Sequence, residues 1–150
     1  MPAADTTKTS PDKLSIVVFS GAYDKVHYAL TMASAALAVN TPATLFFTMG
    51  AIKALLPVKD GKGGWYDLLP TEDGVTASKA DAQLIARKLA GFEEILSACV
   101  TLGASVMVCE MGLRAMGLEG KALRDDVPRS EGGLVTFLAD ASRTGAVIFV

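Results

Sequence analysis

Short runs that are apolar almost without interruption alternate along this chain with longer segments in which apolar residues recur at helical spacing. The uninterrupted runs are residues 14–20, 43–48, 105–109 and 146–150. Continuous runs of β-branched and aromatic residues are typical of strands that are covered on both faces, as in a parallel sheet. We therefore predict a strand over each run.

Helical patterns separate these strands. They predict helices from Asp24, as N-cap, to about residue 39, and over residues 80–102, 110–116 and 134–142. Along the second of these, one face would carry Ile85, Leu89, Phe92, Leu96 and Cys99, with Gly103 ending the helix. Strands that alternate with helices indicate an α/β fold with three layers, α/β/α, around a mostly parallel sheet of about five strands. Residues 123–127 are the candidate for the fifth strand, at an edge.

Length and composition favour one domain. The 150 residues are 51% hydrophobic, which suits a single compact core over residues 14–150. Residues 1–13 hold turn-forming residues without periodicity, and we expect a flexible tail. Residues 57–76 form a long irregular segment after a short amphipathic piece, 51–56. Because such loops are often functional, this segment with Trp65 and Tyr66 is a candidate lid.

Several classes of function are disfavoured. A net charge of -2 with scattered basic residues argues against nucleic-acid binding, and no apolar run is long enough to cross a membrane. The polar N-terminal residues lack a signal-peptide core, so we expect a cytoplasmic protein. One histidine and no CxxC motif give no support for a metal site, and no cofactor motif is present.

Cys109 is the residue with the most specific position. It ends the predicted strand 105–109 and precedes a helix, at the edge where open α/β sheets bind ligands. Backbone N–H groups at such a helix start favour an anion, and a thiolate is one. The helix start alone raises the thiolate fraction only slightly. A large increase in that fraction would need a nearby cation, and the candidates are Lys25, Arg114 and Arg129. We expect the Cys109 sulfur to be reachable from outside.

Cys99 shares the apolar face of its predicted helix, so packing in the core is the default. The helix would run antiparallel to the following strand, which puts the two cysteines about 12 Å apart along the sheet. A disulfide needs Cα atoms within about 7 Å. We therefore expect both thiols to be free, with Cys99 at most ancillary to Cys109.

Several segments together resemble the DsrE/DsrF-like family of sulfur-relay proteins. They are residues 108–118 (VCEMGLRAMGL), 132–139 (GGLVTFLA), 147–150 (VIFV), 18–26 (VFSGAYDKV) and 45–50 (LFFTMG). The spacing of Cys99 and Cys109 is similar to that in a two-cysteine DsrE subgroup.

The resemblance implies a sulfur-transferring function. The cysteine matching Cys109 would hold a persulfide or thiosulfonate and pass it to a TusA-type sulfur carrier, in sulfur oxidation or sulfur relay. It further implies small inorganic sulfur anions such as thiosulfate and tetrathionate as partners, and a homotrimer or homohexamer. The residues that we expect to bind a substrate beside Cys109 are Tyr23, Lys25, Met111, Gly112 and Arg114.

Two other functions stay open at this point. The chain could be a non-catalytic module that binds an anion or a partner protein, with Cys109 in a packing role. A peroxide-reducing thiol enzyme is weaker, because no resolving cysteine is evident near Cys109.

Overall fold

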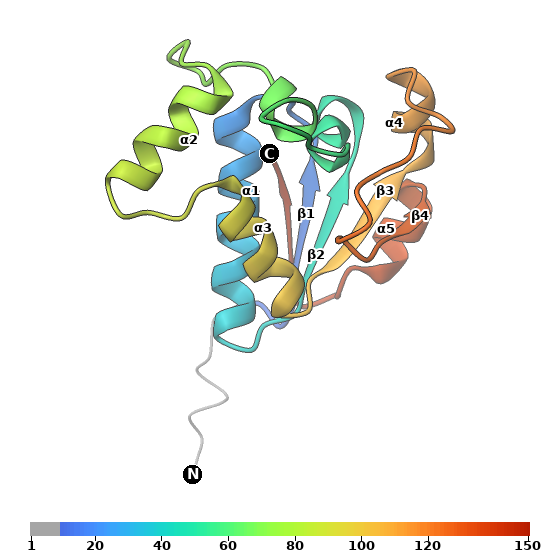
Figure 1. Ribbon diagram of the computed structural model, residues 1–150. Helices are drawn as coiled ribbons and strands as arrows, with labels where there is room; N and C mark the ends of the chain where they lie inside the picture. The colour runs from blue at the N-terminus through green and yellow to red at the C-terminus, as the bar shows by residue number, and fades with distance from the viewer. Residues whose placement is uncertain (1–9) are drawn as a thin grey trace.

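The computed structural model describes residues 10–150, and a five-stranded sheet in the order β4-β3-β2-β1-β5 forms its centre (Figure 1). All four strand pairings are parallel, so the carboxyl ends of the strands meet at one edge. The strands are β1 (Leu14–Val18), β2 (Ala43–Phe47), β3 (Ser105–Cys109), β4 (Ser130–Gly132) and β5 (Ala146–Phe149). The predicted fold class, a three-layer α/β/α arrangement with a parallel sheet, is confirmed.

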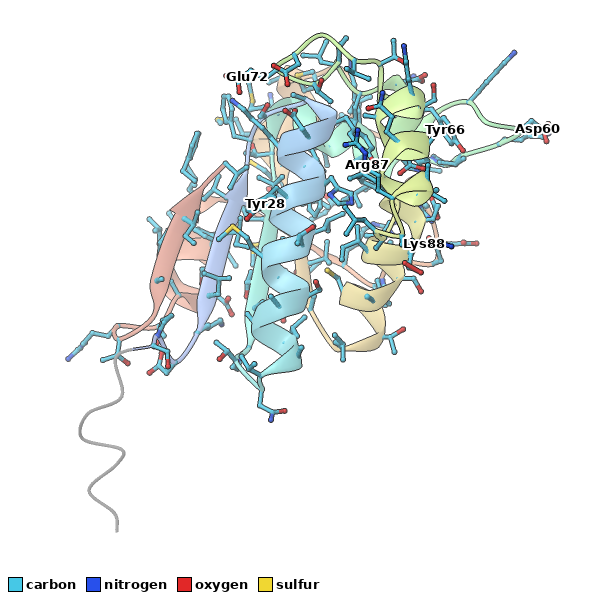
Figure 2. All side chains as sticks on the ribbon, turned by 90° about the vertical axis from the view of Figure 1, so that its left-hand side faces the viewer. Tyr28, Asp60, Tyr66, Glu72, Arg87 and Lys88 are labelled. Carbon is cyan, nitrogen blue, oxygen red and sulfur yellow. The ribbon has the colours of Figure 1, made fainter. Side chains whose placement is uncertain are left out.

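The layers on the two faces of the sheet differ in size. One face, which we call the thick face, is covered by α1 (Tyr23–Ala38) and α3 (Phe92–Thr101), with α2 (Ala77–Ala86) beside α1 (Figures 1 and 2). The other, the thin face, is covered by α5 (Leu134–Asp140). A further helix, α4 (Glu110–Ala115), lies at the carboxyl edge after β3.

Side chains alternate between these faces along each strand, as the pleat requires. Ile16 of β1, together with its neighbours two residues away, belongs to the large apolar core under α1 and α3. Val17, Phe46 and Met107 from three adjacent strands point the other way and form a small separate cluster with Phe137 of α5. The buried apolar residues are thus divided very unequally by the sheet.

The fifth strand is not where we predicted it. Residues 123–127 form no strand, and the edge is β4, which pairs with β3 through Met107 and Ser130, Val108 and Glu131, and Cys109 and Gly132. The sequence Ser-Glu-Gly has no apolar pattern, so only its pairing with β3 makes it a strand. Residues 123–127 are instead held by Arg124, whose guanidinium binds Glu93 and Asp126.

The predicted helix over residues 80–102 is two helices, α2 and α3. Lys88, at the break, has a left-handed φ of 65°. The N–H of Phe92 begins α3 by donating to Asp81 Oδ1 on α2, at 2.6 Å. Of the predicted apolar stripe, Ile85 and Leu89 are therefore exposed, and the part on α3 is buried.

The amphipathic piece belongs to a short 3-10 helix, η2 (Met49–Leu55), and the irregular segment after it contains another, η3 (Gly64–Asp67). Trp65 is buried in the core, stacks on Phe92 and donates from Nε1 to Glu93 at 2.7 Å. The expectation of a lid carrying Trp65 is therefore wrong, because this side chain anchors the segment to the thick face.

Two smaller expectations are corrected as well. Asp24 does not cap α1, because the N-cap position is Ala22, and the Asp24 carboxylate accepts from the N–H of Glu72 instead. Residues 1–9 of the expected tail lie outside the described residues. Lys13 forms an ion pair of 2.8 Å with Asp140 at the end of α5. This ion pair attaches the chain to the rest of the fold just before β1 begins.

Candidate functional site

Cys109 lies where the sequence predicts it, at the junction of β3 and α4. It is the last residue of the strand and the N-cap of the helix, and its Sγ accepts a hydrogen bond from the N–H of Gly112 at 3.3 Å. Side chains that accept at this position satisfy a backbone donor that the helix leaves free. A sulfur anion on Cys109 would thus face a ready hydrogen-bond donor.

Gly112 holds this donor in place because α4 packs very closely on η2. A Cβ at Gly112 would lie 2.7 Å from the N of Met49 and 2.9 Å from Thr48 Oγ1, closer than real contacts allow. Of the predicted substrate-binding residues, Gly112 is the one that hydrogen-bonds to Cys109 within residues 10–150, through its main-chain N–H.

The Cys109 sulfur is covered, contrary to our expectation of an accessible thiol at an open edge. The residue is only 1% exposed and packs with Phe46, Met107 and Phe137. Phe137 stacks on Phe46 with ring centroids 4.9 Å apart. Sequence patterns find the end of a strand, but they do not show that a helix from a later part of the chain returns to cover it.

The cover itself is slight. α5 has seven residues, and Phe137 is its buried side chain, whereas Leu134, Val135 and Leu138 are exposed. Phe137 is a site residue that sequence reasoning missed; the available signal was a lone aromatic residue in a short helix after Gly132 and Gly133.

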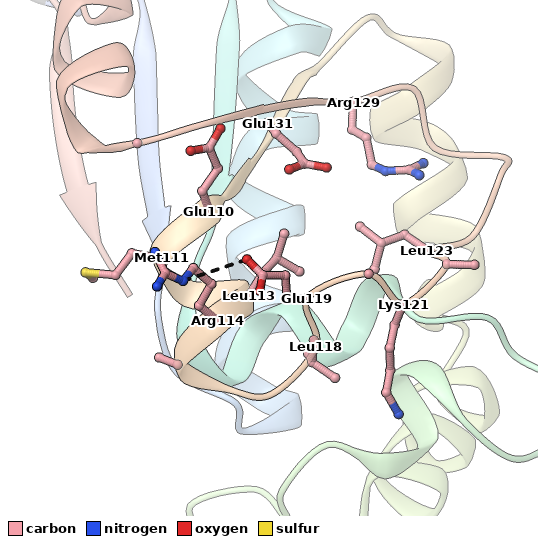
Figure 3. A pocket seen from close by; sticks show the side chains of 14 residues that line it. Glu110, Met111, Leu113, Arg114, Leu118, Glu119, Lys121, Leu123, Arg129 and Glu131 are labelled. Carbon is pink, nitrogen blue, oxygen red and sulfur yellow. Dashed lines mark ion pairs between the residues drawn. The ribbon is translucent and has the colours of Figure 1, made fainter.

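A hollow of about 900 Å³ lies beside α4, and side chains of α4 form part of its lining. Figure 3 shows Glu110, Glu131 and Arg129 around this hollow. The Met111 side chain extends away from Glu131 and Arg129. Arg114 also lines the hollow and makes an exposed ion pair of 3.7 Å with Glu119, an interaction of small energy in water. The lining carries both signs of charge, and Cys109 is not part of it.

The three candidate cations do not reach the sulfur. Among residues 10–150, the hydrogen bond to Cys109 Sγ comes from Gly112 alone. Lys25 is exposed at a separate hollow beside Phe19 and Phe149. Arg129 donates to the carbonyl groups of Arg124 and Val127.

Tyr23 is also placed apart from Cys109. Its ring is buried on the thick face, and its hydroxyl donates to Asp81 at 2.6 Å. Burial, followed by the hydrogen bond to Asp81, raises the pKa of this hydroxyl above its usual range. Met111, by contrast, lies next to the site on α4 and is largely exposed.

Cys99 is a core residue. Its thiol is fully buried under α1 and donates to the carbonyl of Leu30 at 3.2 Å. Burial raises the pKa of Cys99 to about 11, so the thiol stays protonated near neutral pH. Both cysteines are free, as predicted, and the sheet lies between their side chains.

Within residues 10–150, no three His, Cys, Asp or Glu side chains are grouped so that they could hold a metal ion. In the same part of the chain, no helix combines the length and apolar character that a membrane span requires.

Comparison with known proteins extends the description of the fold. The crystal structure of the YchN protein from Escherichia coli superimposes with a TM-score of 0.51, covering 92% of this chain and 99% of that one at 16% identity. The chain has the DsrE-like fold. At this identity the DsrE-like fold is what the two proteins are shown to share.

A sequence relative gives no further function. The chain is 26% identical over 156 residues to the uncharacterized protein YrkE of Bacillus subtilis strain 168, covering 92% of this chain and 96% of YrkE. No protein-family model matches the chain. These comparisons therefore show the fold of the chain and assign it no function.

Proposed function

We propose that the chain is a cytoplasmic sulfurtransferase or sulfur carrier that holds a persulfide or thiosulfonate on Cys109. The observation that carries this proposal is the hydrogen bond from the Gly112 N–H to Cys109 Sγ at the carboxyl edge of the sheet. A donor at this position favours an anionic sulfur, and the apolar residues around it exclude water from a sulfur–sulfur bond. The DsrE-like fold agrees with the proposal.

Loading and transfer are both thiol exchange reactions. With tetrathionate, the Cys109 thiolate attacks an inner sulfur, a sulfur–sulfur bond breaks, and thiosulfate leaves with the electron pair. Cys109 then carries an S-thiosulfonate group. An acceptor thiolate, which we expect on a TusA-type partner, attacks that group next and releases the Cys109 thiolate. Neither step needs an outside oxidant or reductant.

Access to the sulfur requires α5 to move. Phe137 is the buried contact of this helix, and Gly132 and Gly133 precede it. A short segment with one buried anchor belongs to the least stable parts of a fold. Displacement of Phe137 would open Cys109 to a small anion while the large core stays intact.

Intact-mass spectrometry after treatment with tetrathionate tests the proposal. We expect the wild-type chain to gain the mass of one S2O3 group, and Cys109→Ser to gain none. Cys99→Ser is the matched control and should load like the wild type. Adding a TusA-type protein should remove the group from Cys109 and place it on the partner.

The second candidate is a non-catalytic module that binds an anion or a partner protein. The burial of Cys109 in a cluster of apolar side chains favours it, because free cysteine often serves as a small apolar residue. If neither the wild type nor Phe137→Ala takes up sulfur from tetrathionate, the carrier function is wrong. Retention of partner binding by Cys109→Ser would then favour the module.

A homotrimer or homohexamer stays a prediction from the resemblance. Sedimentation equilibrium of the full chain measures the state of association directly, and a monomer at micromolar concentration would contradict it.

A further inference from the structure

Another cavity lies on the thick face, away from Cys109. Its volume is about 430 Å³, and η3, α2 and the start of α3 surround it. Its walls combine apolar and aromatic side chains with acidic ones. The lining includes Trp65, Tyr66, Ile85, Leu89, Phe92 and three carboxylates, those of Asp81, Glu93 and Glu94.

Asp81 is the buried acidic group of this cavity. The residue is 8% exposed, and its Oδ1 accepts two hydrogen bonds of 2.6 Å, from the Tyr23 hydroxyl and the Phe92 N–H. Its second oxygen, Oδ2, accepts no hydrogen bond from any of residues 10–150. Since no buried side-chain oxygen in the described part of the chain lacks a partner, Oδ2 retains contact with solvent, and Asp81 lines the cavity.

The structural role of Asp81 accounts for Oδ1 alone. One oxygen is enough to begin α3 and to bind the Tyr23 hydroxyl, and an asparagine would supply the same acceptor. A carboxylate held nine-tenths out of water is costly unless its charge is compensated. Within residues 10–150, no ion pair joins Asp81 or Glu94 to a cation, whereas Glu93 is paired with Arg124 at 2.7 Å.

The apolar walls limit what can supply the compensating charge. Ile85 and Leu89 are each more than half exposed beside the cavity, which leaves apolar surface at its mouth. Tyr66, which is half-buried and stacks on the buried Trp65 with ring centroids 3.8 Å apart, adds aromatic surface, which attracts cations as well as apolar groups. A hydrated metal ion would not use these walls.

We propose that this cavity binds a small organic cation, an ammonium group joined to an apolar chain. The ammonium would donate to Asp81 Oδ2, and the chain would lie against Leu89, Ile85 and the aromatic pair. No lysine or arginine side chain lines the cavity in the described part of the chain, so nothing competes for the carboxylate. This site is on the face of the sheet opposite to Cys109 and does not depend on the proposed sulfur chemistry.

Trp65 makes the proposal easy to test, because it is the one tryptophan of the chain and lines the cavity. The full chain is titrated with n-hexylammonium chloride at neutral pH and low salt, and the fluorescence of Trp65 is followed. We expect a saturable change. n-Hexanol, which has the same chain without the charge, should give none in the same concentration range.

The decisive variant is Asp81→Asn, which retains an acceptor for Tyr23 and Phe92 but removes the charge. It should weaken n-hexylammonium binding at least about tenfold. Asp73→Asn makes the same change at an exposed position outside the cavity and should bind like the wild type. Cys109→Ser should also bind normally, which separates this site from the proposed function.

Circular dichroism shows whether Asp81→Asn is folded. If it is not, Leu89→Ser takes its place, because that side chain is exposed and its loss removes the apolar wall; it should weaken binding several-fold. No saturable signal, an equal response to n-hexanol, or unchanged affinity in the folded variants would each overturn the proposal.

Discussion

Cys99 and Cys109 are both buried, but they lie on opposite faces of the sheet and under covers of very different size. On the thick face, α1 and α3 enclose Cys99, whose thiol donates to a backbone carbonyl. On the thin face, one short helix covers Cys109 through Phe137, and the sulfur accepts from a backbone N–H. The two sulfurs therefore differ in their hydrogen-bonding role as well as in the size of their cover.

The comparison shows that burial alone does not decide whether a cysteine can react. The cost of uncovering Cys99 is that of opening the main core. The cost of uncovering Cys109 is that of displacing one aromatic ring and a helix of seven residues. Four predictions test this difference, each with a matched variant.

The largest effect is expected from Phe137→Ala. Loss of this ring should lower the free energy of unfolding by about 3 kcal/mol, as for other buried Phe to Ala changes. In a Cys99→Ala background, it should also raise the rate of Cys109 modification by a disulfide reagent at least about tenfold.

Leu96→Ala, on the thick face, serves as the control for Phe137→Ala. It should destabilise the protein by a similar amount without exposing Cys109 under native conditions. Equal rates of Cys109 modification in the two variants would mean that global unfolding, not movement of α5, controls access.

Gly112→Ala should have the next largest effect. The added Cβ would come within 2.7 Å of the Met49 backbone, and overpacking of this kind costs about 1–3 kcal/mol. Displacement of the Gly112 N–H from Cys109 should also slow the loading of Cys109 with tetrathionate. Gly133→Ala, where an added Cβ meets no atom within 4 Å, should leave stability and loading nearly unchanged.

The thick face should show its own pH dependence. Because burial raises the pKa of Cys99 to about 11 from a usual 9.0, the folded state keeps a proton that the unfolded state loses first. The stabilisation is complete below pH 9 and is lost as the pH rises through 11. Between pH 9 and 10, the free energy of unfolding should fall by about 1 kcal/mol more in the wild type than in Cys99→Ala.

Urea unfolding at both pH values measures this difference. The pKa of Tyr23 is raised as well, and its contribution acts in the same direction in both proteins, so the comparison cancels it. Parallel pH profiles for the two proteins would contradict the assignment to Cys99.

The smallest effect is expected from Val135→Glu. This side chain is on the same helix as Phe137 but is 83% exposed, and exposed substitutions usually change stability by less than about 0.5 kcal/mol. Thermal unfolding of the two α5 variants side by side checks whether the helix is held by Phe137 alone. A large loss in Val135→Glu would show that the outer side of α5 has a partner in solution.

Local pattern was sufficient for the strands that carry the site. The apolar run of β3 and the following turn into α4 placed Cys109 correctly, because both signals lie within a few residues. Asp81 shows the opposite case. Its contact with Phe92 begins a new helix, and nothing in the periodicity of residues 80–102 announces that the helix stops near Lys88.

The prediction of the edge strand was wrong for a related reason. β4 is a strand only because β3 offers free backbone groups to pair with, while the more apolar residues 123–127 are held away by the ion pairs of Arg124. Hydrogen-bond partners that are distant in sequence decided both outcomes.

By itself, the sequence determined a parallel α/β fold and a cysteine at the end of its third strand, because hydrophobic period and turn residues are local properties. The tertiary structure decided how deeply each cysteine is buried, which backbone group it meets, and that an acidic, aromatic cavity forms at the break between α2 and α3. Those properties depend on which distant segments cover each face of the sheet. No stretch of the chain carries that information alone.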